Sequence, residues 1–187
     1  MMKRPVLGRY EQVENGQYFI DVSANKVESL YNNFDKSSPF IRRDLEQDLV
    51  DYLIESAREL GAHPYSIRLH FEEPCEPAGL SRVQQSVNNY FQYLTHLEKL
   101  KIKQIFGKSV VMMLVGMVIL FLSVSLHQAI GESPGVMAGV VAEGLTIAAW
   151  VAIWEALALL LMELFPCFRN VRLFQRIAVA PVELVSR

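Results

Sequence analysis

The most informative absence in this chain is positive charge along its C-terminal part. No Lys or Arg occurs between Lys108 and Arg169, and two apolar stretches, 109–130 and 136–165, fill most of that interval. Each stretch exceeds the roughly 20 apolar residues that cross a hydrocarbon core about 30 Å thick. The sequence therefore predicts an integral membrane protein in which two transmembrane helices form a hairpin, with the lipid bilayer as its first partner.

Cysteine is scarce, and basic residues form no stripe. Cys75 and Cys167 lie far apart without metal-type spacing, so we expect free thiols and no metal site. The 18 Lys and Arg are balanced by 20 Asp and Glu, which argues against nucleic acid as a partner. No phosphate-binding glycine loop, nucleophile elbow or zinc motif is present, so we expect neither a cofactor nor an enzymatic activity.

Basic residues flank the two apolar stretches and predict their orientation. Those before the first stretch and after the second are Lys99, Lys101, Lys103, Lys108, Arg169, Arg172 and Arg176. The turn between the stretches, 131–135, has none. Because positive residues stay on the cytoplasmic side, both termini are expected in the cytosol. The N-terminal sequence has no secretory signal, so the first stretch is expected to direct insertion.

Residues 1–107 have the composition of a cytosolic domain that mixes helices and strands (an α+β domain). Aromatic and β-branched residues predict a strand at 17–22, and alternation of apolar and polar residues predicts another at 66–72. Two strands make a poor sheet because their edges stay unpaired. A third strand near 6–13, or strand pairing between subunits, should therefore complete it.

The first long helix is predicted from its capping residues. Ser38 and Pro39 fit an N-cap followed by proline at the first helical position. Gly61 suits the position that ends the helix after Leu60. A short helical turn at 26–34 should precede this helix.

A second helix is predicted to run from the cytosol into the membrane. A capping box starts it at Ser81, and no proline occurs before Ile130, so the continuous helix would be a rod about 75 Å long. A break near Gly107 is the alternative. The transmembrane hairpin is then assigned to 108–166, and 167–187 to a cytosolic tail.

Stripes of small residues predict how the apolar helices pack. On the first stretch, five residues fall on one side of the helix, within about 40° of one line along it: Ser109, Gly116, Leu120, Ser123 and His127. On the second, the residues that repeat every four positions are Gly144, Ala148, Ala152 and Ala156. Small residues let helix backbones approach closely in a membrane. One face can be filled within the hairpin and the other by a neighbouring subunit, which predicts a homo-oligomer.

Three glutamates on the second stretch are the candidate functional residues. Glu143 is roughly level with His127, and the two could pair; Glu163 lies near the cytosolic boundary, within reach of Lys108 or water. Glu155 lies about 6 Å from the middle of the stretch by helical rise, where an unpaired carboxylate costs several kcal/mol. It is either a proton- or cation-responsive group on an oligomeric axis or a neutral acid hydrogen-bonded to a neighbouring helix.

Two short segments carry a resemblance to other proteins. Residues 34–40 read Phe-Asp-Lys-Ser-Ser-Pro-Phe, and residues 150–155 read Trp-Val-Ala-Ile-Trp-Glu ahead of Phe165 and Pro166. In these segments the chain resembles a widespread group of bacterial two-span membrane proteins without an assigned activity. The resemblance covers most of the chain and implies a bacterial inner-membrane location. That group often has Arg-Pro where this chain has Glu155 and Ala156, so it implies no shared role for Glu155.

Together these patterns favour a homo-oligomeric membrane scaffold. Its cytosolic domain would assemble with other copies or recruit a protein partner. The alternative is an oligomeric ion channel, or a proton- or cation-coupled transport protein, with Glu155 near the middle of the pore.

Overall fold

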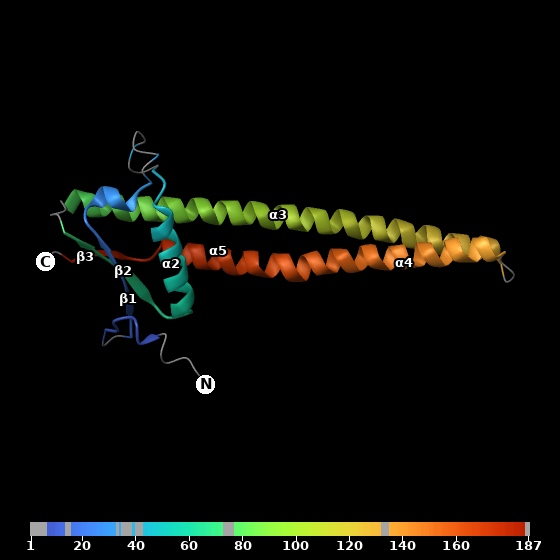
Figure 1. Cartoon of the computed structure of the whole chain (residues 1–187), viewed down its shortest axis with the longest axis horizontal. Coiled ribbons are helices and arrows are strands. Elements are labelled where there is room, and N and C mark those ends of the chain that lie inside the picture. The colour runs from blue at the N-terminus through green and yellow to red at the C-terminus, as the bar shows by residue number, and fades with distance from the viewer. Residues whose placement is uncertain are drawn as a thin grey trace. The chain divides into compact units, whose positions relative to one another are not determined.

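The computed structural model is mostly helical, with one small sheet (Figure 1). The residues it describes are 7–13, 16–32, 34, 39, 43–72, 77–131 and 135–185. The chain divides into two compact units. We call residues 1–97 and 170–187 the sheet unit, and residues 98–169 the helical pair.

The sheet has three parallel strands in the order β1-β2-β3. β1 (Tyr18–Ala24) and β2 (Tyr65–Phe71) confirm the two predicted strands. β3 (Val182–Val185) pairs with the other side of β2. The register aligns Ile20 with Ile67 and Ile67 with Val182, so one face of the sheet is aliphatic across all three strands.

The third strand does not come from the N-terminal segment, so that expectation was wrong. Within 7–13, Gln12 makes an isolated antiparallel bridge to Tyr18, while residue 6 lies outside the described part of the chain. β3 lies instead in the segment 167–187, for which the sequence predicted no strand. Four residues are too few for a clear alternating pattern, so only pairing with β2 identifies them as a strand.

Parallel strands need long crossover connections, and both connections here are helical. The first contains a short 3-10 helix, η1 (Val27–Leu30), and α2 (Gln47–Leu60). The second contains α3 (Pro77–Ile130), α4 (Val136–Leu159), the π-helical segment η4 (Leu160–Leu164) and α5 (Phe165–Ala178). The helical pair is therefore an insertion within a crossover of the sheet.

The start of α2 was predicted too early. Ser38 lies outside the described residues, Pro39 is not helical, and the helix begins at Gln47. Leu45 is 2% exposed and forms a β-bridge with Tyr31, so the segment before Gln47 is held extended. The end of α2 is as predicted, at Gly61 with a φ of 60°.

The continuous second helix is confirmed. Its start was predicted too late: α3 begins at Pro77, so Ser81 lies inside the helix and does not cap it. The helix passes through Gly107 without a break and ends at Ile130. Gly131 follows with a φ of 70°, a conformation that favours glycine. The second helical run does not end at Pro166, because α5 contains this proline and continues beyond it. Proline has no N–H to donate to the helix. The π-helical segment η4, with its wider turn, lies just before it.

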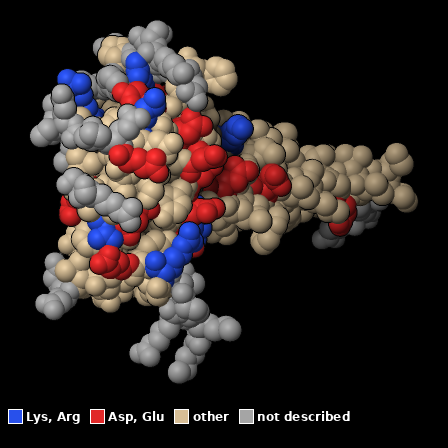
Figure 2. Space-filling model, turned by 60° about the vertical axis from the view of Figure 1, so that its left-hand side comes forward, with Lys and Arg blue, Asp and Glu red and all other residues tan. Residues whose placement is uncertain are grey.

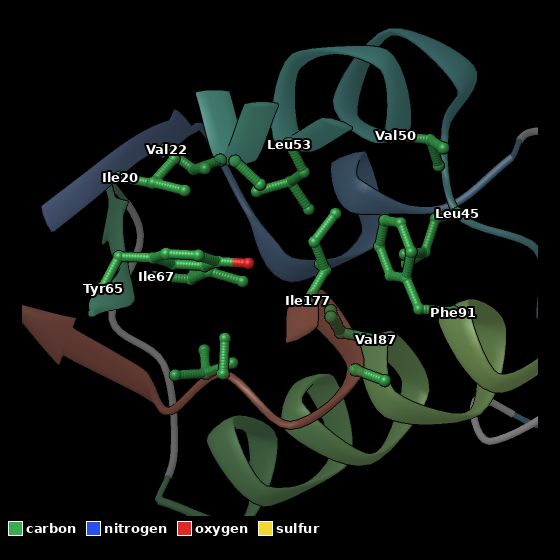
Figure 3. Close-up of a cluster of buried hydrophobic side chains, with 14 of the residues drawn as sticks. Ile20, Val22, Leu45, Val50, Leu53, Tyr65, Ile67, Val87, Phe91 and Ile177 are labelled. Atoms are coloured by element: carbon green, nitrogen blue, oxygen red, sulfur yellow. The ribbon is translucent and has the colours of Figure 1, made fainter. Parts of the chain in front are cut away.

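The core of the sheet unit lies on one face of the sheet. Side chains from β1, β2, α2, the first part of α3 and α5 converge there (Figure 3). Ile20, Leu53 and Ile67 are 0 or 1% exposed, as are Phe91 and Ile177. The opposite face of the sheet is more polar and only partly buried, which is unusual because parallel sheets are normally covered on both faces.

Candidate functional site

Within the helical pair, α3 and α4 pack antiparallel. Ser123 Oγ lies 2.6 Å from Thr146 Oγ1. Seven residues earlier on α3, Gly116 lies against Ile153, which is seven residues later on α4. A Cβ added to Gly116 would be 2.8 Å from Ile153 Cγ1 and 3.2 Å from Ile153 N, so only glycine fits this contact without displacement. Gly116 sets how closely the two helices approach.

Hydroxyl groups form a small polar cluster in the same interface. Ser123 Oγ donates to the carbonyl of Ala142 at 3.2 Å, and Thr146 Oγ1 donates to the same carbonyl at 3.1 Å. Ser109 is 1% exposed, and its Oγ has no hydrogen-bond partner in the part of the chain that the structure describes. Of the stripe predicted on the first stretch, Ser109, Gly116 and Ser123 are buried, while His127 is exposed.

The buried face of α4 follows a seven-residue spacing. Ala142, Ala149 and Ala156 are 0 or 1% exposed. Of the predicted four-residue ladder, Ala156 is buried and Ala152 half-buried, and the two exposed members are Gly144 and Ala148. Antiparallel helices that stay in contact over several turns meet at positions close to seven residues apart, because a four-residue step drifts around the helix. Gly144 and Ala148 are therefore left on the outside of the pair.

The candidate glutamates lie on the outer surface of the helical pair. Glu143, Glu155 and Glu163 are all exposed. Among the described residues, no ion pair or hydrogen bond joins Glu143 to His127, whose Nδ1 lies 2.9 Å from the Ser123 carbonyl oxygen. Glu155 has no side-chain partner within the described chain either, and its neighbour Trp154 is 73% exposed.

One acidic residue of the helical pair was not a candidate from the sequence. Glu98 is only 7% exposed; Lys101 Nζ donates to its Oε1 at 2.7 Å, and its Oε2 has no partner among the described residues. The pKa of the nearby Cys167 thiol is raised, mainly by burial and secondly by the Glu98 carboxylate. The i,i+3 spacing of Glu98 and Lys101 on a helix was the available sequence signal.

The outer surface of the helical pair is strongly apolar. In the most apolar 18-residue segment of each of the two helices, only 17% and 11% of the residues are buried. A core helix of a soluble protein would be mostly buried. Phe121, Trp150 and Met162 are 72%, 63% and 76% exposed. Long stretches of this surface show no charged side chain (Figure 2). Both helices are long and apolar enough to cross a membrane.

A second cluster lies on the polar face of the sheet. Arg68 pairs with Asp21 (Nη2 to Oδ2, 3.0 Å) and with Glu11. The Arg68 guanidinium also lies 4.4 Å from the centre of the Phe19 ring. On the other side of Asp21, His70 Nε2 is 3.1 Å from Oδ1. Hydrogen bonding from Arg68 holds the pKa of Asp21 below its ordinary value despite partial burial.

The Asp21 ion pair predicts a specific acid response. Because the pKa of Asp21 is lowered in the folded state, its contribution to stability is complete above the ordinary value of 3.8 and is lost as the pH falls below it. We expect the urea midpoint of the sheet unit to fall less on acidification in Asp21→Asn than in the parent chain. Urea titrations at a series of pH values measure this, with Glu183→Gln on β3, which does not pair with β1, as the control. Parallel pH curves for all three proteins would contradict it.

The chain matches no family model, no curated protein and no solved structure.

Proposed function

We propose that this chain is a homo-oligomeric integral membrane scaffold. The helical pair spans the bilayer, and the sheet unit lies in the cytosol, where it assembles with other copies or recruits a protein partner. The observation that supports this best is the apolar outer surface of the helical pair, which no described part of the chain covers. A continuous apolar surface of this kind marks contact with lipid or with another protein.

The backbone of the helical pair suits a hydrocarbon environment. α3, α4 and η4 satisfy their main-chain groups within the helices, as any membrane-spanning segment must. Lysines and arginines flank the apolar stretches, and residues 131–135 carry no positive charge. This distribution supports cytosolic termini. The resemblance of residues 34–40 and 150–155 supports the bacterial inner membrane as the location.

Glu155 supports self-association within the membrane. Its carboxyl group is on the outside of the helical pair, close to the middle of the second apolar stretch, and has no partner among the described residues. Facing lipid, that group would cost several kcal/mol, whereas a helix of a second copy can accept or donate a hydrogen bond there. Gly144 and Ala148, exposed on the same helix, would allow that helix to come close.

The membrane assignment is tested by extraction of the full chain expressed in bacteria. We expect it to stay with the membrane after an alkaline carbonate wash and to be released by detergent. Mass photometry in lipid nanodiscs should then give a mass above that of one 21.3 kDa chain per disc. Release by carbonate would refute membrane insertion, and a strictly monomeric chain would refute the scaffold.

Substitutions at Glu155 separate the scaffold from the channel. If Glu155 is a neutral hydrogen-bonding acid, Glu155→Gln keeps the oligomer, while Glu155→Ala weakens it by about 1–2 kcal/mol, or roughly five- to thirtyfold in dissociation constant. Glu163→Ala is the control, since Glu163 is also exposed but near the end of the stretch. An oligomer unchanged in Glu155→Ala would refute this role. A proton or cation flux in liposomes that Glu155→Gln abolishes would support the channel instead.

A further inference from the structure

We propose that the sheet unit binds a small organic cation at the carboxyl end of its strands. A hollow of about 710 Å³ lies there, within the size range of small-molecule sites. Its lining comes from the ends of all three strands and includes Asp21, Ser23, Asn25, His70, Phe71 and Glu72. This proposal concerns the sheet unit alone and does not depend on the function proposed for the helical pair.

The position of the hollow follows from the parallel topology. In a parallel sheet every strand ends at the same edge, so residues at the ends of different strands are brought together there. Here β1 ends at Ala24, β2 at Phe71 and β3 at Val185, and all three residues line the hollow. The side chains that reach it are therefore gathered by the fold from parts of the sequence far apart.

A second hollow adjoins the first. It has a volume of about 560 Å³, shares Asp21, Ser23, Ala24 and Asn25 with the first, and extends to the start of α2. There it is lined by Glu46, Asp48 and Tyr52 among others. The end of β1 thus contributes to the lining of both hollows.

The charge of the lining selects the class of ligand. The acidic lining residues are Asp21, Glu46, Asp48 and Glu72, and neither hollow is lined by a described Lys or Arg. Arg68 neutralises Asp21 from outside the hollow, so the other three carboxylates have no cation partner among the described residues. Among the described residues no group of three His, Cys, Asp or Glu side chains is close enough to hold a metal ion. An amine or guanidinium on a short carbon chain fits these observations better than a metal.

One side of the site is held in place before a ligand arrives. Asp21 is fixed between Arg68 and His70, and the Phe71 ring and Val185 offer apolar surface nearby. The carbon chain of an organic cation can pack there while its charged ends face the carboxylates. Preorganised polar groups reduce the entropy lost on binding.

The class of ligand is tested with three probes of equal carbon-chain length. Putrescine, its diol analogue butanediol and the dicarboxylate succinate are titrated calorimetrically into the full chain in nanodiscs at low ionic strength. We expect saturable binding of putrescine, at least about tenfold tighter than that of the diol, and none of succinate. No saturable binding of putrescine, or equal affinity for putrescine and the diol, would overturn the proposal. Preferred binding of succinate would overturn it too.

The site is tested with a matched pair of variants. Glu72→Gln removes an exposed carboxylate that lines the larger hollow, and Glu183→Gln removes an exposed one on β3 outside both hollows. We expect the first to weaken putrescine binding about three- to tenfold and the second to leave it within twofold. Because both side chains are exposed, neither change should unfold the sheet, which circular dichroism verifies. Equal losses in both variants would show a diffuse surface attraction and would refute the site.

Discussion

Replacing Gly116 by leucine is expected to separate α3 from α4. The new side chain would overlap Ile153, whose backbone N is already 3.2 Å from an ideal Cβ at position 116, so a rotamer change of one side chain cannot relieve the clash. Overpacking of this kind costs about 1–3 kcal/mol, which corresponds to about 2–12 °C in the midpoint of a chain of this size. Thermal unfolding of the detergent-solubilised chain measures the loss.

Gly107 provides the control on the same helix. A Cβ built there meets no described atom within 4 Å, so Gly107→Leu removes a flexible residue from a helix without a clash. It should leave stability unchanged or raise it by about 0.5–1 kcal/mol. Opposite effects of the two substitutions would establish close packing at Gly116. Equal losses would show that the contact with Ile153 does not form in the detergent-solubilised chain.

Replacing Phe91 by alanine is expected to destabilise the sheet unit most. Phe91 is 0% exposed in the core shown in Figure 3, with its ring centre 6.2 Å from that of Phe174. Truncation of a buried phenylalanine costs about 3–5 kcal/mol, which is a large part of the stability of a small domain. Hydrogen–deuterium exchange should show faster exchange across β2, with protection of α4 retained.

Tyr93 is the matched aromatic control for that experiment. It lies on the same helix two residues later and is 55% exposed, so Tyr93→Ala should change stability by less than about 0.5 kcal/mol. If Phe91→Ala leaves exchange in β2 unchanged, the core around Phe91 does not stabilise the sheet. If α4 loses protection as well, the two units do not unfold separately.

Elements with long, uninterrupted patterns were predictable from the sequence. The continuous α3 follows from the absence of proline between Ser81 and Ile130, and β2 follows from the alternation around Ile67. The start of α2 and the strand β3 were not predictable, because contacts distant in sequence decide them. Leu45 is held extended by Tyr31, and Val182 becomes a strand residue only beside Ile67.

The candidate sites were predictable to a different degree. The sequence identified the apolar stretches and Glu155 near the middle of the second one. It did not show which face of α4 would be buried, since Gly144 and Ala149 are both small residues. The cluster around Asp21 was missed altogether. Arg68 and His70 are 47 and 49 residues away in sequence, and only the parallel pairing of β1 with β2 brings them to Asp21.

The insertion of the helical pair between β2 and β3 has a consequence for biosynthesis. β3 is translated last, so the sheet lacks its third strand until both apolar helices have left the ribosome. During that interval one edge of β2 stays open, and open edges invite pairing with other chains. If the apolar helices insert into a membrane as proposed, their insertion can begin before the sheet is closed, and a chain arrested before residue 182 would keep the open edge of β2.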